Sequence, residues 1–274
     1  MLLIYGATGY TGGLVVEEAL RRGLRPIVAG RDPKKVEALG ARTELPTRAF
    51  PVERADLTGV TVLLNIAGPF SRTARPLVDA CVRAGVHYLD VTGEIAVFEG
   101  LAARDAEARA AGILLLPGVG FDVVPTDCLA AHLKARLPDA THLRLAIAGG
   151  GGLSHGTATT AAENLDAGGA VRRNGRIERV PSAYRTLDVD FGRGERSTVT
   201  IPWGDVSTAW HTTRIPDIEV YAAFPPAAIT AMKLGNYAAP LLRTRVVRTL
   251  VQRWIDQRPA GPTPEERARG YAVV

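Results

Sequence analysis

The sequence is poor in the residues that build disulfide frameworks and zinc sites. Only two of its 274 residues are cysteines, Cys81 and Cys128, and neither belongs to a Cys-x-x-Cys pair. Both lie in apolar segments that we expect to be helical, where a reduced thiol packs as a small hydrophobic side chain. The five histidines show no His-x-x-x-His or Cys/His ligand spacing. We therefore expect neither disulfides nor a metal site.

Long apolar runs and charge blocks are also absent. No run approaches the roughly 18 to 20 apolar residues that a membrane span needs, and the start MLLIYG lacks the positive charge of a signal peptide. The net charge is +5, but the 33 Lys and Arg residues are scattered over expected helix surfaces. A nucleic-acid-binding protein would gather them into one patch. We expect a cytoplasmic protein without a membrane span and without a nucleic-acid partner.

Two enzyme classes lack their motifs. No tyrosine is followed four residues later by a lysine, which excludes the Tyr-x-x-x-Lys chemistry of short-chain dehydrogenases, and no Walker A loop is present. A G-x-S-x-G sequence does occur at residues 152–156, and potential triad partners follow it at Asp188, Asp190, Asp205 and His211. Four consecutive glycines at residues 149–152 make a loose joint there, not the strained turn that a nucleophile needs. A hydrolase is therefore the least favoured alternative.

Apolar runs and amphipathic segments alternate through the first 120 residues. Apolar runs at residues 2–5, 27–29, 60–66, 86–90 and 113–116 predict strands buried on both faces. Helix-period segments lie at residues 11–22, 33–39, 74–83 and 95–111. Each segment ends at a glycine suited to a left-handed cap: Gly23, Gly40, Gly85 and Gly112. This alternation predicts an α/β domain over residues 1–122 with a doubly wound parallel sheet of the Rossmann type.

The alternation stops after residue 122, and the rest of the chain predicts a smaller α+β domain over residues 123–258. A helix at 125–137 and a strand at 141–148 precede the glycine joint, and a Thr/Ala-rich helix reaches about residue 165. Asn174-Gly175 predicts a type I′ hairpin at 171–180, and further strands are expected at 186–191 and 197–201. A basic amphipathic helix at 236–257 leads to a loose linker at 259–270 within a tail of residues 259–274.

Three glycines in the stretch IYGATGYTGG, at residues 6, 9 and 12, are the main indication of function. Gly6 lets the chain turn sharply, Gly9 lets the backbone approach a pyrophosphate, and Gly12 lets the helix pack close to the strand. A strand that ends in such a turn and opens a helix directs backbone N–H groups at an anion. We predict dinucleotide binding by Gly6, Thr8, Gly9, Tyr10, Thr11 and Gly12. The alternative is a merely structural turn, because the spacing is G-x-x-G-x-x-G.

The next predicted strand ends on Arg31, with Lys34 and Lys35 close behind. An acidic residue at this tip would bind the ribose 2′-hydroxyl of NAD, whereas an arginine pairs with the 2′-phosphate of NADP. Asp32 keeps NAD open as the alternative unless its carboxylate caps the following helix. We expect NADP, bound in part by Arg31 and Lys35.

A second glycine turn follows the strand predicted at residues 60–66. Ligands of open α/β sheets lie beyond the carboxyl ends of the strands, so this turn should also face the cofactor. The expected contacts are Asn65, Ala67, Gly68 and Pro69. A plain Gly-Pro turn is the alternative.

Two further strand ends carry carboxylates and glycines, at residues 91–94 and 117–122. Because both turns leave the carboxyl ends of one sheet, nicotinamide and substrate are expected to meet there. The candidate catalytic groups are Tyr88, Glu94 and Asp122. Glu94 could instead cap a helix, and Asp122 could hold the turn between the domains.

In combination, the motifs GATGYTG, AGRD, NIAGPF, HYLDVTGE and PGVGFDVVPTDC resemble those of the saccharopine dehydrogenase-like family of NADP-binding oxidoreductases. The similarity is greatest to its trans-acting enoyl reductase branch. It continues through SHGT at residues 154–157 and IPWGDVSTAWHTTRIPDIEVY at residues 201–221, and so covers nearly the whole chain.

This resemblance implies a Rossmann domain followed by an α+β domain whose mixed sheet shapes the substrate site and often a dimer interface, so a homodimer is expected. It also implies that Thr92, Gly93 and Glu94, with residues 120–122, border the nicotinamide. Members of the family reduce an imine made from an amino acid and a semialdehyde, or a C=C bond of a lipid or polyketide intermediate. They usually continue past the segment matching residues 266–270, whereas this chain stops at Val274, so its second domain is either short or lacks a closing piece.

The sequence therefore predicts an NADPH-dependent oxidoreductase that transfers a hydride to an activated C=C or C=N bond of a small-molecule or lipid-type substrate. The alternative from another class is a non-catalytic NADP-binding sensor, because no recognisable acid/base pair stands out.

Overall fold

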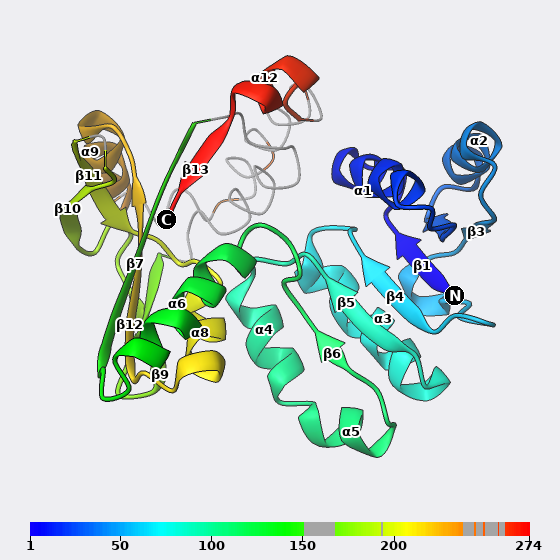
Figure 1. The fold of residues 1–274 in the computed structure, drawn as a ribbon, viewed down its shortest axis with the longest axis horizontal. Helices are drawn as coiled ribbons and strands as arrows, with labels where there is room; N and C mark the ends of the chain where they lie inside the picture. Colours follow the sequence, from blue (N-terminus) through cyan, green and yellow to red (C-terminus); the bar gives the residue numbers. More distant parts are fainter. Residues whose placement is uncertain (151–167, 193, 238–243, 245–248, 250–256, 258–260) are drawn as a thin grey trace. The chain divides into compact units, whose positions relative to one another are not determined.

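A computed structural model describes residues 1–150, 168–192, 194–237, 244, 249, 257 and 261–274 (Figure 1). The chain divides into two compact units, Met1–Asp122 and Val123–Val274. Three features expected from the sequence lie outside the described residues. They are the Thr/Ala-rich helix, the G-x-S-x-G sequence and most of the basic helix expected at residues 236–257.

The first unit is built on a six-stranded parallel sheet in the order β3-β2-β1-β4-β5-β6. Its strands are β1 (Leu2–Tyr5), β2 (Ile27–Gly30), β3 (Thr47–Ala49), β4 (Val62–Asn65), β5 (His87–Asp90) and β6 (Leu115–Leu116). The strand that opens the chain thus lies in the middle of the sheet, and the predicted doubly wound parallel sheet is confirmed. Strand β3 was not predicted, because this three-residue edge strand is largely exposed and carries no apolar run.

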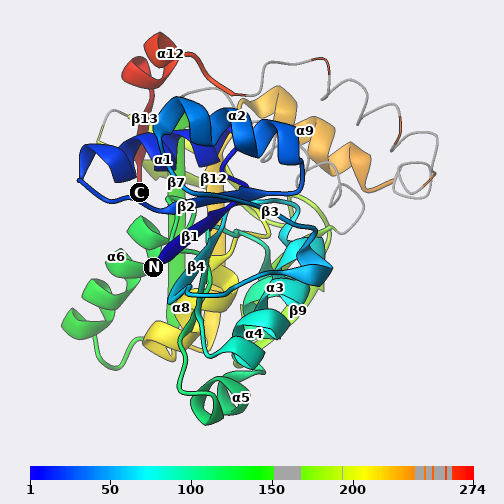
Figure 2. The ribbon, with the colours of Figure 1, turned by 90° about the vertical axis from the view of Figure 1, so that its right-hand side faces the viewer.

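Helices cover both faces of this sheet (Figure 2). Two helices, α1 (Tyr10–Arg21) and α2 (Pro33–Thr43), pack on one face around Ile4 and Val28. The other face carries the helices α3 (Phe70–Ala84), α4 (Ile95–Ala102) and α5 (Asp105–Ala110), with the 3-10 turn η1 (Val52–Arg54). Leu3 and Leu63 lie in the core on that side, and both are fully buried. The two cores hold β1 between them and fix where its carboxyl end lies.

The glycine that was expected to end α2 lies inside that helix. Gly23, Gly85 and Gly112 do follow helices with φ of 74°, 66° and 67°, as predicted. Helix α2, however, continues through Gly40 to Thr43 and ends at Glu44, a left-handed residue with φ of 55°. A Cβ on Gly40 would collide with the Thr47 methyl group and lie 3.0 Å from the Leu45 carbonyl oxygen. Glycine is used here for the close approach of β3, not for a helix end.

The second unit contains a mixed sheet in the order β10-β11-β12-β7-β13, with the β8–β9 hairpin attached to β12. Its strands are β7 (His142–Gly150), β8 (Gly169–Arg173), β9 (Arg176–Val180), β10 (Thr186–Asp190), β11 (Glu195–Thr200), β12 (Asp217–Ala223) and β13 (Tyr271–Val273). Strand β12 runs parallel to β7 and antiparallel to β11. The predicted hairpin turn is confirmed, with φ of 49° at Asn174 and 76° at Gly175. The described helices are α6 (Val124–Arg136), α8 (Asp205–Thr213), α9 (Pro226–Gly235) and α12 (Pro264–Arg269).

The prediction of a loose linker at residues 259–270 is wrong for its second half, which forms helix α12. Thr263 and Glu266 form a reciprocal capping box that starts α12. The Thr-x-x-Glu spacing of this motif is visible in the sequence but stands among prolines and glycines that favour a loop. After α12, Tyr271 pairs antiparallel with Gly150 of β7.

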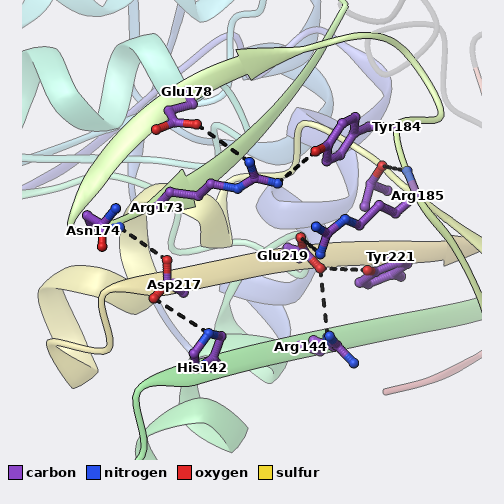
Figure 3. A network of polar contacts seen from close by, with 11 residues as sticks. His142, Arg144, Arg173, Asn174, Glu178, Tyr184, Arg185, Asp217, Glu219 and Tyr221 are labelled. Carbon is purple, nitrogen blue, oxygen red and sulfur yellow. Dashed lines mark hydrogen bonds and ion pairs between the residues drawn. The ribbon is translucent and has the colours of Figure 1, made fainter.

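One face of the second sheet carries a polar network around the buried carboxylate of Glu219, which is 8% exposed (Figure 3). One carboxylate oxygen accepts a hydrogen bond from Arg185 at 2.9 Å. The other accepts from the Tyr221 hydroxyl at 2.6 Å and lies 3.8 Å from Nε of Arg144. Burial and the neighbouring carboxylate raise the pKa of Tyr221 to about 12. A buried charge is tolerated only when it is paired in this way, so the network favours one register of β7 against β12.

The packing at Gly40 predicts a stability difference between two helical glycines. Gly40→Ala is expected to lower the unfolding free energy by about 1–3 kcal/mol, because the added methyl group must displace Thr47 or the backbone at Leu45. Gly100→Ala in α4 is the matched control, since no atom lies within 4 Å of its added Cβ. That variant should be neutral or gain up to about 1 kcal/mol, because alanine is the better helix former.

Urea denaturation followed by far-UV circular dichroism measures both effects. All three tryptophans lie in the second unit, at residues 203, 210 and 254, so their fluorescence serves as an internal reference. Equal midpoints for the two variants would contradict the role given to Gly40.

Candidate dinucleotide-binding site

The glycine turn after β1 is held by contacts that leave no room for side chains. Gly6 has φ of 86°, and a Cβ there would lie 2.8 Å from the backbone nitrogen of Ala67. A Cβ on Gly12 would overlap the Gly6 carbonyl oxygen and lie 2.8 Å from Cα of Ala7. The turn is therefore pressed between the start of α1 and the loop that follows β4.

Helix α1 begins at this turn without a side-chain cap. Its N-cap residue is Gly9, which has no side chain with which to cap the helix. Gly13 donates the first intrahelical hydrogen bond, to the Gly9 carbonyl oxygen at 2.9 Å. An α-helix offers no acceptor of its own to the N–H groups of its first turn, and the positive end of its dipole lies there. A helix that starts at a glycine turn after a strand is therefore suited to bind an anion.

Among the other expected contacts on this turn, Thr8 and Thr11 are exposed and Tyr10 is half-buried. The Thr8 hydroxyl lies 3.7 Å from the position of a Cβ on Gly30, the last residue of β2. The glycine turn and the tip of β2 are therefore neighbours, as a dinucleotide that spans both requires.

At that tip, Asp32 caps helix α2. Its carboxylate accepts a hydrogen bond from the backbone N–H of Lys35 at 3.3 Å, and Pro33 occupies the first helical position. This is the alternative that the sequence left open for Asp32. Arg31 and Lys35 are both exposed, and the charge of Arg31 acts on the Tyr5 hydroxyl.

A pocket opens between the glycine turn and α2. Its lining residues are Ala7, Thr8, Gly9 and Gly13 on one side, and Lys35, Ala38, Leu39 and Arg42 on the other. No acidic side chain is among these residues, whereas two are cationic. The pocket therefore has the charge and the backbone that fit a phosphorylated ligand.

In the loop after β4, Asn65 was expected to touch the cofactor, but it is fully buried. Its amide nitrogen donates to Thr73 Oγ1 and to the Tyr88 hydroxyl, each at 3.1 Å. Its amide oxygen accepts from the backbone N–H of Ala67 at 3.0 Å. Asn65 therefore shapes the loop from within, whereas the other expected contacts, Ala67, Gly68 and Pro69, keep exposed surface.

Tyr88, a candidate catalytic residue, is also fully buried, and its contacts are those of a positioning residue. Its hydroxyl donates to Asp90 Oδ2 at 2.9 Å. Asp90 Oδ1 in turn accepts from the backbone N–H groups of Thr92 at 3.0 Å and Gly118 at 2.9 Å. A hydroxyl without exposed surface cannot reach a substrate. The chain from Asn65 through Tyr88 and Asp90 instead ties together the loops that follow β4, β5 and β6.

In the loop after β5, the side chains of Thr92 and Glu94 are both engaged in contacts within the protein. Thr92 is fully buried, and its hydroxyl oxygen accepts from the backbone N–H of Glu94 at 3.0 Å, so its side chain does not line a site. The Glu94 carboxylate accepts from the backbone N–H groups of Phe70 and Ser71, each at 2.9 Å. Glu94 thereby satisfies the start of α3, which is the capping role that the sequence left open.

Of the three candidate acids, Asp122 keeps the arrangement that a proton donor needs. It is partly exposed, and a Cβ on Gly93 would lie 3.2 Å from its Oδ2 atom, so the carboxyl group rests against the loop after β5. Desolvation by burial raises the pKa of Asp122 above its ordinary value. A carboxyl group with a raised pKa beside a ligand site is typical of proton transfer.

Sequence reasoning missed Asp90, Thr73 and Arg42. The signal for Asp90 was the period of a strand, which puts residues 88 and 90 on one face of β5. Arg42 was missed because α2 was expected to stop before it. Among the residues that the structure describes, no cluster of three or more His, Cys, Asp or Glu side chains could hold a metal ion. None of the described helices has the length and apolarity needed to cross a membrane.

Comparisons with known proteins agree with this geometry. Residues 2–116 match the family model described as Saccharopine dehydrogenase NADP binding domain. The trans-acting enoyl reductase of Mycobacterium ulcerans (strain Agy99) is 30% identical over 148 residues, covering 49% of this chain and 35% of that protein. A probable mitochondrial saccharopine dehydrogenase-like oxidoreductase of Arabidopsis thaliana is 32% identical over 148 residues, covering 46% of this chain and 33% of that protein.

Among solved structures, apo saccharopine dehydrogenase (L-Glu forming) from Saccharomyces cerevisiae has a TM-score of 0.61 at 15% identity, covering 98% of this chain and 69% of that chain. This likeness shows the fold. Together the matches confirm the predicted resemblance to saccharopine dehydrogenase-like proteins and trans-acting enoyl reductases. The matching part spans about a third of the length of the two curated relatives.

The raised pKa of Asp122 predicts a pH dependence of stability. Because the folded state holds this proton more tightly than the unfolded state, the group stabilises the fold at low pH. That contribution is lost as the pH rises from about 4, the ordinary pKa of aspartate, through the folded-state value. The unfolding free energy of the wild type minus that of Asp122→Asn should therefore fall over this interval and then level off.

Chemical denaturation of both proteins at half-unit steps of pH measures this difference in unfolding free energy. Because both proteins contain all the other carboxylates, the contributions of those groups cancel in the difference. A difference that rose with pH would mean that the folded state lowers the pKa of Asp122.

Proposed function

We propose that this chain, whose first unit matches the saccharopine dehydrogenase NADP-binding domain, is an NADPH-dependent reductase of activated C=C or C=N bonds. The observation that carries the proposal is the uncapped start of α1 at the glycine turn, at the carboxyl end of a central strand of a parallel sheet. Ligands of such sheets lie beyond the carboxyl ends of the strands.

The glycine turn would hold the pyrophosphate. The N–H groups that open α1 supply hydrogen bonds, and the helix dipole adds partial positive charge. Gly9 presents no Cβ to the approaching phosphates, while Gly6 and Gly12 keep the turn in place through their contacts with Ala67 and Ala7. The residues present therefore fit a dinucleotide.

The strand tip and α2 would select NADP over NAD. A carboxylate at this strand tip binds the ribose hydroxyls of NAD. One oxygen of Asp32 accepts from the backbone N–H of Lys35 at the helix start, so helix capping accounts for an acidic residue at this position. Arg31 and Lys35 are exposed cations beside it, which favour a cofactor with an additional phosphate.

The loops after β4, β5 and β6 would border the reacting end of the cofactor. When bound, the nicotinamide supplies the hydride to an electron-poor double bond. The buried network of Asn65, Tyr88 and Asp90 keeps these loops in one arrangement, which orients the reactants. The Asp122 carboxyl group would hold the proton that the reduced product takes up, because burial favours its protonated form.

The substrate class is inferred from relatives and not from a pocket. Among the matching proteins, one kind is named trans-acting enoyl reductase and another saccharopine dehydrogenase. An enoyl C=C bond is therefore our first candidate and a C=N bond our second. The domain boundaries, the homodimer and the cytoplasmic location stay predictions.

Cofactor binding gives the first test. Titration with NADPH and NADH, followed by nicotinamide fluorescence, should show tighter binding of NADPH. Arg31→Ala should weaken NADPH binding roughly tenfold, as expected for the loss of a charge-assisted hydrogen bond, and leave NADH binding unchanged. Arg83→Ala, on the exposed last turn of α3, is the control for removal of one surface charge. Equal affinity of the wild type for the two cofactors would refute NADP selection.

Catalysis gives the second test, through loss of NADPH absorbance with enoyl thioesters, imine-forming pairs of amino acid and semialdehyde, and aldehydes. The expected result is turnover of one of the first two classes. With that substrate, Asp122→Asn should lower kcat by roughly 10²-fold or more while NADPH affinity is retained, because the variant cannot donate a proton. A protein that binds NADPH, consumes none and copurifies with another protein would instead be an NADP sensor.

A further inference from the structure

The pocket between the glycine turn and α2 has a positive charge that the cofactor contacts expected from the sequence explain only in part, because they include Lys35 but not Arg42. Lys35 and Arg42 both line it, and it contains no acidic side chain. Both cations are exposed, and neither forms an ion pair with any carboxylate in the part of the chain that the structure describes. Two cations that face one pocket without a carboxylate make its electrostatic potential positive, which favours an anion there.

The opposite wall of the pocket also favours an anion. It consists of Thr8 and Gly9 at the uncapped start of α1, with Ala7 and Gly13 beside them. The Thr8 hydroxyl can donate a hydrogen bond, and the helix start adds partial positive charge. The cations of α2 and the start of α1 therefore act on the same space from two sides.

Helix α2 aligns its two cations by its own periodicity. Lys35 and Arg42 are seven residues apart, which places them on one face two turns from each other. Ala38 and Leu39 lie between them and form an apolar floor without hydrogen-bonding groups. Arg42 differs from Lys35 in its planar guanidinium group, which can bind two oxygen atoms of one phosphate.

Arg31 is not among the residues that line this pocket. It follows Gly30, which lies beside the Thr8 hydroxyl of the pocket wall, so Arg31 approaches the phosphate from the strand tip. The two cations on α2 therefore need an explanation of their own.

We infer that Arg42, together with Lys35, binds the 2′-phosphate of NADP in this pocket and is a determinant of the preference for NADP over NAD. This inference rests on the proposed function, because it assumes that the pyrophosphate lies on the glycine turn. The chemistry recognised is a phosphate monoester on a ribose. A ribose 3′-phosphate shares that chemistry, so the test must separate the two positions.

Calorimetric titration with 2′,5′-ADP, 3′,5′-ADP and 5′-AMP compares the ligands without requiring turnover. The wild type should bind 2′,5′-ADP at least tenfold more tightly than the other two. Arg42→Ala should lose roughly tenfold or more in affinity for 2′,5′-ADP and for NADPH, and little for 5′-AMP and NADH. Arg42→Lys should fall between Arg42→Ala and the wild type, because it keeps the charge and loses the paired contact.

Ala38→Glu provides an independent test, because it places a carboxylate between the two cations on an exposed helix position that tolerates glutamate. It should weaken NADPH binding by at least the same factor and NADH binding by less, because NADH brings the pyrophosphate but no 2′-phosphate to the added carboxylate. Arg83→Ala controls for loss of a surface charge, and thermal unfolding of each variant checks that the fold is intact.

The outcomes separate this inference from the function on which it rests. Failure of the wild type to bind either NADPH or NADH would overturn both. Preferential binding of NADPH that is unchanged in Arg42→Ala and Ala38→Glu would overturn the role of Arg42 alone. Tighter binding of 3′,5′-ADP than of 2′,5′-ADP would overturn the assignment to the 2′-phosphate.

Discussion

Close backbone packing around the first glycine turn is the constraint on which the site depends. The backbone of Gly6 lies against Ala67 in the loop after β4, and Gly12 lies against Gly6 and Ala7, with no space for a Cβ at either glycine. The start of α1 is thereby fixed directly over the end of a strand in the middle of the sheet. If the start of α1 lay further from the loop after β4, its N–H groups would face water. They could then not act on one ligand together with that loop.

The opposite half of the site is held by buried polar groups instead of by glycine. Asp90 is fully buried and accepts hydrogen bonds from Tyr88 and from the backbone of Thr92 and Gly118. Burial raises the pKa of Asp90, while these donors act in the opposite direction. Such a network is stable only when all its members are in place, so it fixes three loops together. The first half of the site is therefore set by shape and the second half by hydrogen bonding.

The same physics explains what the sequence could reveal. Strands buried on both faces and glycine turns leave local signals, so the parallel sheet and the glycine turn between β1 and α1 were predictable. Strand β3 left none, because it is short and exposed. Asn65 at the end of β4 and Tyr88 within β5 are polar side chains of strands that lead to the site, a pattern shared by ligand contacts and by buried positioning groups. Only burial separates these two roles, and burial depends on contacts with residues distant in the sequence, such as Thr73 and Gly118.

Helix α2 links a detail of packing to the choice of cofactor. If Gly40 ended the helix, as the sequence suggested, α2 would stop before Arg42. Lys35 would then be the only cation of α2 at the pocket. In the structure Gly40 instead lets Thr47 approach a helix that continues to Thr43. That additional turn brings Arg42 to the face that carries Lys35, while Asp32 is held at the other end of the helix as its cap. The acidic residue that would favour NAD is thus engaged by the same helix whose extension supplies a second cation. In the proposed function, selection of a phosphorylated ribose would therefore be a property of the whole helix, and a single arginine at the strand tip would account for only part of it.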